Sequence, residues 1–537
     1  MRTFGSFDYV IIGAGTAGCV LANRLSGDPG TSVLLLEAGG KDDWIWIHIP
    51  VGYLYCIGNT RTDWCYKTEP EPGLNGRSIN YPRGRVLGGS SSINAMLYLR
   101  GQARDYDEWA QLTGDSGWSW ANVLPVFMKS EDHWRGADEK HGQGGEWRVE
   151  RPRVTWEILE AFRDAAVEAG IPRTDDFNRG DNEGVGRFDV NQRNGVRWSA
   201  AKAFLRPALN RPNLTVITGA SVKRLRLDGR RAAGVEFYRG NEETYAEARR
   251  ETILAAGAIG SPQILQLSGI GPAAVLQKHG IAVGHDLPGV GENLQDHLQL
   301  RMAFKVKHAL TLNTLLGSWW QKAMMGCQYA WSRSGAMTMP PSQMGAFTKS
   351  DASQATPNLE YHVQPISLDK FGDPPHRFNA FTASVCNLRP MSRGHVRIAS
   401  GDPRAYPAIA PNYLSAEEDR QVATRAIRLT RRIVLGTDAM KKYEPEEYTP
   451  GAGFQSDDEL VEAAGRIGTT IFHPVGTCKM GRNGDGMAVV DPELRVRGME
   501  GLRVIDASVM PTITSGNTNS PTVMIAERGS EILLRRN

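Results

Sequence analysis

The stretch FDYVIIGAGTAGCVLANRLSGDPGTSVLLLEAGG, residues 7–40, carries the clearest fold signal in the chain. Residues 9–12 are an apolar run that predicts a buried strand, and residues 17–25 have the spacing of a helix with small side chains toward a sheet. A second apolar run, residues 33–36, ends at Glu37. Strand, helix and strand in this order predict a βαβ unit within a parallel sheet.

Gly13, Gly15 and Gly18 fit the pattern G-x-G-x-x-G at the turn from the first strand into the helix. The first glycine permits the turn, the second lets a pyrophosphate approach the backbone, and the third lets helix and strand pack closely. The amides and the positive dipole end at the helix start then face the phosphates. Glu37 is placed to accept hydrogen bonds from a ribose. The unit predicts dinucleotide binding and leaves NAD and FAD open.

A second segment rich in glycine and serine, GRVLGGSSSINAMLYLRG, covers residues 84–101. Another backbone turn of this kind is more than NAD binding requires, whereas the bulky ring system of a flavin would need such a wall. A simple Ser/Gly linker would not continue into the apolar run INAMLYLR. The segment therefore favours FAD.

Several long motifs resemble those of the glucose–methanol–choline (GMC) family of FAD-dependent oxidoreductases. They are GRVLGGSSSIN (84–94), GAIGSPQILQLSGIG (257–271), GVGENLQDH (289–297), FHPVGTCKMG (472–481) and a C-terminal block at 489–527. The resemblance spans nearly the whole chain and implies an α/β Rossmann-type FAD-binding domain with a discontinuous α+β substrate domain. We expect residues 1–155, 200–300 and 466–537 in the FAD domain. Residues 156–199 and 301–465 should form the substrate domain, an antiparallel sheet with helices.

The resemblance also implies which residues contact FAD: Gly13, Gly15, Gly18, Glu37, Arg85, Gly88, Gly89, Ser90, Asn94, Val222, Ala256, Asp506, Ala507, Thr518 and Thr522. Some members of the family tether FAD covalently through a histidine just before the asparagine of the first motif. Ile93 stands at that position here. We therefore expect non-covalent FAD, which acid precipitation should release from the protein.

Catalysis by a flavin creates a need for a base, because an alcohol that gives up hydride must also lose its hydroxyl proton. Histidine suits that role at neutral pH. His473 lies in IFHPVGTCKMG, where Pro474 and Gly476 turn the chain, and the resemblance makes it the catalytic base. The same resemblance makes Asn517, in SGNTNSPT, the partner that orients the hydroxyl. His297 is interpreted as structural.

Composition excludes some classes of function. Net charge is +3 in 537 residues, with dispersed basic residues, so nothing indicates a nucleic-acid partner. The six cysteines form no C-x-x-C pair and predict reduced thiols. His133, His141, His279, His308 and His376 are expected in loops or at the surface. No His/Cys/Asp group has metal-ligand spacing, so no metal is expected.

Location and membrane contact are predicted from the absence of two kinds of segment. Neither a signal peptide nor a long apolar span is visible, so the expectation is a cytoplasmic protein with at most peripheral contact with the inner face of a membrane. The nearest apolar segment, residues 315–331, predicts a helix. We expect it to pack inside the second domain, with contact to a membrane or cover over a substrate entrance as the alternative.

The predicted function is the oxidation of a small-molecule alcohol, taken as primary, to an aldehyde by hydride transfer to FAD. The electrons would pass to a quinone or other carrier, or to oxygen; a dehydrogenase is favoured. Choline dehydrogenase proper is one alternative, with Trp319, Trp320 and Trp331 as aromatic faces for its ammonium group. Two rival classes of protein also stay open: a lyase or photodecarboxylase on the same scaffold, and a flavoprotein without catalysis.

Overall fold

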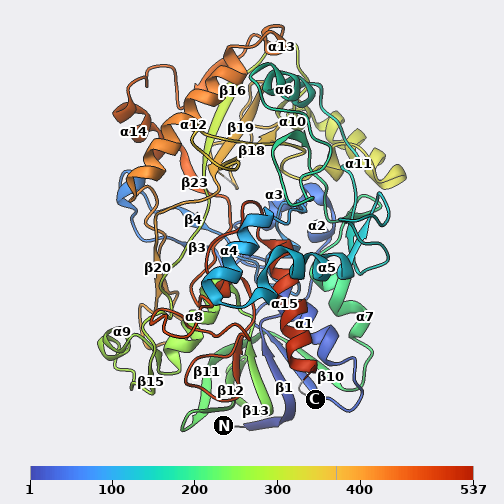
Figure 1. Ribbon diagram of the computed structural model, residues 1–537. Coiled ribbons are helices and arrows are strands. Elements are labelled where there is room, and N and C mark those ends of the chain that lie inside the picture. The colour runs from blue at the N-terminus through green and yellow to red at the C-terminus, as the bar shows by residue number, and fades with distance from the viewer. Residues whose placement is uncertain (1, 371, 536–537) are drawn as a thin grey trace.

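The computed structural model describes residues 2–370 and 372–535. Two large sheets lie at opposite ends of the molecule, and helices and long connections occupy the region between them (Figure 1). Each sheet has seven strands, and each is drawn from segments far apart in the sequence.

The first sheet carries the strand–helix–strand unit predicted from residues 7–40. Its strands are, in spatial order, β10 (Leu214–Thr218), β2 (Val33–Glu37), β1 (Arg2–Ile12), β13 (Glu242–Leu254), β12 (Arg231–Arg239) and β11 (Ala220–Asp228), with β24 (Leu502–Val504) paired to β13. Strands β10, β2, β1, β13 and β24 are parallel, whereas β11, β12 and β13 are antiparallel. The parallel part is the predicted Rossmann-type core, which is confirmed.

Helix α1 (Thr16–Leu25) follows β1 and lies beside α15 (Asn519–Leu534), the last helix of the chain (Figure 1). Arg24 on α1 forms an ion pair with Glu527 on α15 at 2.6 Å, and Glu527 is fully buried. Removing one partner of a buried pair leaves an uncompensated charge, so the pair ties the C-terminal helix to the nucleotide-binding unit.

The second sheet is antiparallel, as predicted. Its strands are β22 (Glu446–Thr449), β16 (Leu298–Lys305), β19 (Ala380–Asn387), β18 (Leu359–Gln364), β17 (Met344–Thr348) and β7 (Gly184–Arg187), with β23 (Gly468–Thr470) paired to β16. One face packs apolar side chains against α6 (Glu157–Glu168) and α12 (Glu417–Leu435). Because side chains alternate along a strand, the other face of β18 presents Glu360, His362 and Gln364 toward the interior between the sheets.

Two shorter elements frame that interior. Helix α8 (Gly257–Leu267) begins just after β13, and a small antiparallel pair, β20 (His395–Arg397) and β21 (Ala408–Ala410), lies between β19 and α12 in the sequence. Helix α12 has Ala416 as its N-cap, with no hydrogen bond from a capping side chain. Acidic residues in the first turn stabilise the helix start instead.

Residues 315–331 depart from the first expectation. They form the end of α10 (Leu312–Leu316) and most of α11 (Trp319–Ser332), and Tyr329 is the buried residue of α11. The helix projects at the edge of the second sheet, so the prediction of a packed helix is wrong (Figure 1). Within the described ranges, no helix combines the length and apolar character needed to cross a bilayer.

Candidate active site

A long cavity runs between the two sheets. At one end it is lined by Gly13, Gly15 and Glu37, where β1 and β2 end, and at the other by His362 and Gln364 of β18. Parallel strands present their carboxyl ends at one edge of a sheet, which is where nucleotide ligands bind in open α/β folds. The cavity therefore joins a nucleotide-binding edge to the polar face of the second sheet.

The nucleotide end is built by glycines at positions where a side chain would clash with the backbone. Gly13 has φ +98°, and a Cβ there would lie 2.6 Å from the carbonyl oxygen of Ala255. Gly18 brings α1 against β1 so closely that a Cβ would lie 1.8 Å from the carbonyl oxygen of Gly13. A Cβ on Gly89, at φ +52°, would lie 2.6 Å from the Cα of Gly15. The two glycine-rich turns thus touch and form one cradle.

Glu37 closes this end of the cavity. Its carboxylate accepts hydrogen bonds from the amides of Ala14 at 2.9 Å and Gly39 at 2.8 Å. Burial raises the pKa of Glu37 to about 7, although these amides and the charge of Arg85 act in the opposite direction. A carboxylate can accept about four hydrogen bonds. The two remaining acceptor sites suit a ribose diol.

Most residues expected to contact FAD line this cavity: Gly13, Gly15, Glu37, Arg85, Gly89, Ser90, Asn94, Val222, Ala256, Asp506, Ala507, Thr518 and Thr522. Gly18 and Gly88 do not line it. Gly88 has φ +88° and donates its amide to the carbonyl oxygen of Ala14 at 2.8 Å, so it fixes the cradle from behind. The glycine cradle, the helix start and the carboxylate fit the pyrophosphate and ribose of a dinucleotide.

His473 stands at the second-sheet end of the cavity, on a loop that follows β23. Its backbone amide donates to Asp296 Oδ1 at 2.8 Å, and Thr470 donates its hydroxyl to Asp296 Oδ2 at 2.5 Å. Gln295 and Val475 exchange backbone hydrogen bonds, so the motif at 289–297 runs antiparallel to the histidine loop. Residues 289–297 therefore hold the loop that carries His473 in place.

Asn517 lies opposite His473, one residue before Thr518, the N-cap of α15. The amide nitrogen of Asn517 is 3.0 Å from Nε2 of His473. Ser515, two residues before Asn517, is held by Asp105, which accepts hydrogen bonds from the Ser515 amide at 2.7 Å and from its hydroxyl at 2.8 Å. Two residues that are 44 positions apart in the sequence thus meet across the cavity.

His297 is the third member of this group. Its Nδ1 is 3.0 Å from Nδ1 of His473, and its Nε2 is 3.1 Å from the carbonyl oxygen of Leu388. A carbonyl only accepts, so Nε2 of His297 carries hydrogen and its Nδ1 accepts from Nδ1–H of His473. The tautomers assigned by this network leave the lone pair of His473 on Nε2, facing Asn517 and the cavity. His297 is therefore a positioning residue, in keeping with its structural interpretation.

His362 on β18 is a site residue that the sequence did not reveal. Its Nε2 lies 3.4 Å from Oδ1 of Asn517 and 3.1 Å from Oε1 of Glu360, which is fully buried. The signal lay in LEYHVQ, residues 359–364, where Leu, Tyr and Val alternate with Glu, His and Gln. That alternation predicts a strand with one apolar and one polar face, but not what the polar face meets.

The electrostatic setting keeps His473 neutral. Burial is the main cause that holds the pKa of His473 well below its usual value, and repulsion from Arg83, and from His297 and His362 when these are protonated, acts in the same direction. A neutral imidazole with its lone pair toward the cavity can accept a proton. The arrangement is thus a base, Nε2 of His473, next to an amide that can hold the oxygen of a hydroxyl group.

Aromatic side chains line the same cavity, but not the ones expected. Tyr53, Trp64, Tyr66 and Tyr406 are among its lining residues. Trp319, Trp320 and Trp331 do not line it; they lie on the exposed face of α11. The hypothesis that these three tryptophans face a bound ammonium group is therefore wrong.

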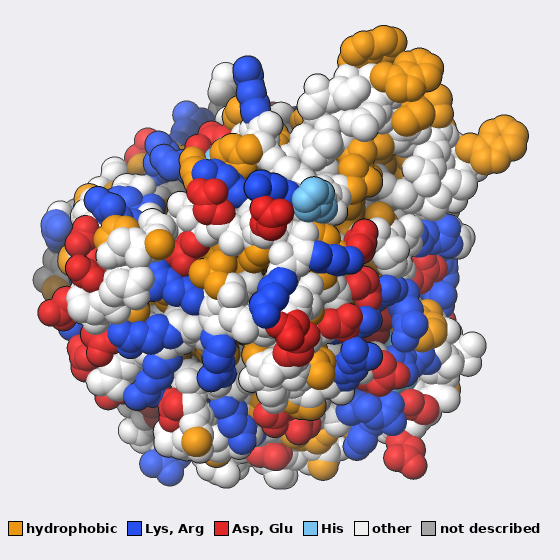
Figure 2. Space-filling model, turned by 90° about the horizontal axis from the view of Figure 1, so that it is seen from above, with side chains coloured by type: hydrophobic (Ala, Val, Ile, Leu, Met, Phe, Trp, Pro, Cys, Tyr) orange, Lys and Arg blue, Asp and Glu red, His pale blue; other side chains and the backbone are white. Residues whose placement is uncertain are grey.

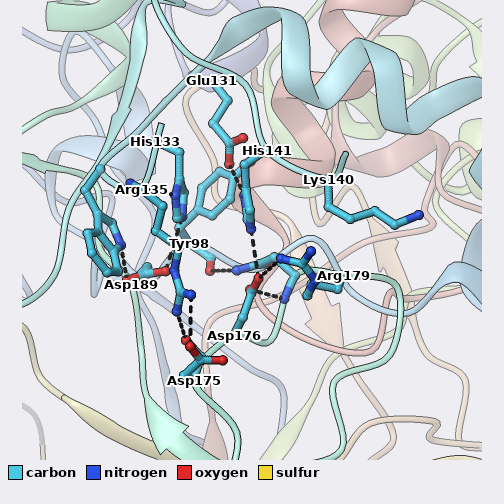
Figure 3. Close-up of polar contacts among 12 residues, drawn as sticks. Tyr98, Glu131, His133, Arg135, Lys140, His141, Asp175, Asp176, Arg179 and Asp189 are labelled. Carbon is cyan, nitrogen blue, oxygen red and sulfur yellow. Dashed lines mark hydrogen bonds and ion pairs between the residues drawn. The ribbon is translucent and has the colours of Figure 1, made fainter. Parts of the chain in front are cut away.

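Two histidines expected in loops or at the surface are buried in a separate ionic cluster (Figure 3). His133 lies in a strand and is 2% exposed, so the expectation is wrong for it, whereas His141 lies in a loop, as expected, but is fully buried there. Their rings stack with centroids 3.9 Å apart, and His141 contacts Asp176 through Nε2 at 2.8 Å and Glu131 through Nδ1 at 3.4 Å. Spacing along the chain gave no sign of this cluster, because it joins β5 (Glu131–His133) to turns near residues 141 and 176.

The cluster also bears on the expected absence of a metal. Ligand atoms of Glu131, His133 and His141 lie within 4.8 Å of one another. However, Arg100 already pairs with Glu131 at 2.8 Å, and His141 is engaged at both ring nitrogens. Arg100 and His141 supply the positive charge that such a group of carboxylates requires. The lack of a resident metal stays a prediction.

His141 should make stability depend on pH. Burial opposes its protonation, but hydrogen bonds to Asp176 and Glu131 outweigh burial and raise the pKa of His141 to about 9. Because the pKa of His141 is higher in the folded protein than the value near 6.5 of the unfolded chain, protonation of His141 stabilises the fold. This contribution is complete below about pH 6.5 and is lost as the pH rises toward about 9.

We expect His141→Gln to lower the free energy of unfolding by on the order of 3 kcal/mol at pH 6 and by much less at pH 9. Urea unfolding of both proteins across this pH range measures the difference. His279→Gln, a change at a histidine outside the cluster, is the control. Equal destabilisation by His141→Gln at both pH values would contradict a protonated His141.

Comparison with known sequences establishes the family. The sequence model of the GMC oxidoreductase N-terminal region matches residues 7–299, and that of the C-terminal region matches residues 390–526. The chain belongs to the GMC oxidoreductase family. It is an FAD-dependent enzyme that acts on CH–OH groups, and the expected cofactor and enzyme class are confirmed.

Relatives of known name cover almost the whole chain. An oxygen-dependent choline dehydrogenase of Pectobacterium atrosepticum is 43% identical over 534 residues, 99% of this chain and 95% of the relative. The protein of the same name from Klebsiella pneumoniae is 44% identical over 537 residues, 99% of this chain and 96% of the relative.

Solved structures show the same fold. A pyridoxine 4-oxidase from Mesorbium loti has a TM-score of 0.89 at 33% identity, with 99% of both chains covered. A formate oxidase has a TM-score of 0.92 at 27% identity, with 100% of this chain and 99% of the other covered. These likenesses show that the chain shares the overall fold of both proteins.

Proposed function

We propose that this enzyme oxidises a primary alcohol to an aldehyde, with His473 as the base and Asn517 as its partner. One observation carries the proposal: Nε2 of His473 and the amide of Asn517 lie 3.0 Å apart inside the cavity that begins at the glycine cradle. A hydroxyl oxygen within hydrogen-bond reach of both atoms would donate its hydrogen to Nε2, in place of the bond from Asn517, and would accept a hydrogen bond from the amide.

The residues of this chain supply proton transfer and orientation. Nε2 of His473 takes the hydroxyl proton. Nδ1–H of the same ring remains hydrogen-bonded to His297, which keeps the ring in place. The Asn517 amide donates to the substrate oxygen as its negative charge grows. His362 lies next to Glu360 and contacts Oδ1 of Asn517 through Nε2, which fixes the Asn517 side chain. FAD, when bound, supplies the hydride acceptor.

The cofactor would be held by the residues of the glycine cradle, Glu37 and the cavity wall. Segments 1–155, 200–300 and 466–537 would provide this domain, and 156–199 with 301–465 would provide the substrate domain. Ile93, at the position of the tethering histidine, supports non-covalent FAD.

Choline is a second candidate substrate. The relatives named choline dehydrogenases support it, as do Tyr53, Trp64, Tyr66 and Tyr406 in the cavity, because aromatic faces attract quaternary ammonium groups. A carrier such as a quinone is the proposed electron acceptor, with oxygen as the alternative named for the relatives.

An anaerobic alcohol panel tests the function. We expect loss of the oxidised flavin absorbance when the holoenzyme is mixed with its alcohol, and choline should be compared with uncharged primary alcohols of similar size. Reoxidation by oxygen against a quinone then identifies the acceptor. A flavin that no alcohol reduces would instead favour a lyase, a photodecarboxylase or a structural cofactor.

A further inference from the structure

Helix α11 (Trp319–Ser332) carries its apolar side chains outward. Trp319 is 77% exposed, Trp320 59%, Met324 52% and Trp331 93%. Large apolar side chains on a protein surface are ordinary when scattered singly, but a contiguous group marks a binding surface. Figure 2 shows hydrophobic side chains gathered on a projecting corner of the molecule, over α11.

The outward face is continuous along the helix. At about 100° per residue, positions 319, 320, 323, 324, 327, 330 and 331 fall within an arc of about 140°. Their residues are Trp319, Trp320, Ala323, Met324, Cys327, Ala330 and Trp331, and each is exposed. Tyr329, which is buried, lies on the opposite side and donates its hydroxyl to the carbonyl oxygen of Gly195 at 3.1 Å. The outward face of this helix is therefore apolar, whereas the outward face of an ordinary surface helix is polar.

The charged residues in the stretch of sequence that carries α11 have one sign. The sequence has no Asp or Glu between Asp296 and Asp351. Lys322 on the helix and Arg333 at its end are both exposed. Tryptophan prefers the boundary between the headgroups and acyl chains of a bilayer, and exposed cations are attracted to anionic headgroups. Composition and charge together match a lipid surface.

The size of the face argues against a stable dimer through it. Trp319, Trp320, Met324 and Trp331 together offer on the order of 500 Å², since a fully exposed aromatic side chain presents about 150–250 Å². A specific protein interface needs about 800 Å² from each partner. A bilayer has no such requirement, because a few aromatic side chains inserted at the boundary already bury apolar area.

We propose that α11 docks on the surface of a bilayer that contains anionic lipids, lying in the interface without crossing it. Trp319, Trp320, Met324 and Trp331 enter the boundary between headgroups and acyl chains, and Lys322 stays at the headgroups. The helix packs against the short turn Ala336–Thr338, which leads directly to Pro341 and Ser342 in the cavity wall. Docking therefore places the catalytic cavity close to the lipid surface.

Flotation of the FAD-loaded protein with vesicles tests the proposal. We expect it to float with phosphatidylcholine vesicles that contain phosphatidylglycerol and less with phosphatidylcholine alone. The triple change Trp319→Ser, Trp320→Ser and Trp331→Ser should lower the partition coefficient at least about 100-fold. Lys322→Glu should lower it about tenfold on anionic vesicles and leave it unchanged on neutral ones.

A matched pair of methionines provides the control. Met324→Ser, on the outward face, should weaken vesicle binding several-fold, whereas Met391→Ser, 59% exposed but away from α11, should not. All variants should retain flavin reduction by alcohol in solution, which shows that they are folded. The proposal fails if the wild-type protein binds neither vesicle, or if the triple variant binds as well as the wild type. It also fails if α11 instead mediates self-association without lipid that the triple change abolishes.

Discussion

Replacing His473 by alanine is expected to slow the reduction of the flavin by alcohol by about a hundredfold to ten-thousandfold. The reason is geometric as well as chemical. The hydrogen bond between Nδ1 of His473 and His297 leaves the lone pair of His473 on Nε2, facing Asn517 and the cavity. Without it, the hydroxyl proton has no acceptor at the point where the hydride leaves carbon. Anaerobic stopped-flow absorbance measures the rate.

Two controls separate this effect from damage to the fold. The His473→Ala protein should keep its FAD and its melting temperature within a few degrees, because Asp296 holds the loop through the backbone amide of residue 473. Asn517→Ala should cause a smaller loss, since the amide orients the oxygen but takes no proton. A His473→Ala enzyme that reduces its flavin within a few-fold of the wild-type rate would show that another group is the base.

The second large effect concerns two neighbouring glycines, Gly39 and Gly40. A Cβ on Gly39 would lie 2.1 Å from the backbone carbonyl oxygen of Arg85, whereas a Cβ on Gly40 would meet nothing within 4 Å. Gly39→Ala should therefore push the end of β2 away from the second glycine-rich segment, at a cost of on the order of 3 kcal/mol. Gly39 also donates its amide to Glu37, so the carboxylate at the ribose end would shift with it.

We expect Gly39→Ala to retain at least tenfold less FAD than the wild type after purification, and Gly40→Ala to retain the normal amount. The ratio of flavin to protein absorbance and the melting temperature measure the two effects. Similar behaviour of the two variants would contradict the close contact between β2 and residues 84–86. The pair is informative because the two glycines share the same motif and differ in what surrounds them.

The local parts of the site follow from the sequence. The strand–helix–strand order predicted at residues 7–40 appears as β1, α1 and β2. These features are local, because apolar spacing and glycine positions are encoded within a few residues of one another. The resemblance to the GMC family supplied His473 and Asn517, which no local pattern identifies as partners.

The wrong expectations share a different physical cause. For His133, His141 and the tryptophans of α11, the neighbouring residues in the sequence indicate only how often such a side chain is buried. Whether it is buried in this protein depends on distant segments of the chain. His141 is buried because distant carboxylates and Arg100 surround it. The tryptophans are exposed because only one side of α11 has protein to pack against.

The order of residues alone is enough to establish that this chain binds a dinucleotide at a glycine-rich turn and resembles enzymes that oxidise alcohols with FAD. Spacing within short segments is sufficient for that, since each turn, strand and helix start depends on near neighbours. The way His297, His362 and Asn517 surround His473 emerges only when the chain is folded. Hydrogen bonds such as those at 3.0 Å between these side chains join strands and loops separated by up to 176 residues, and no pattern along the chain specifies such distances.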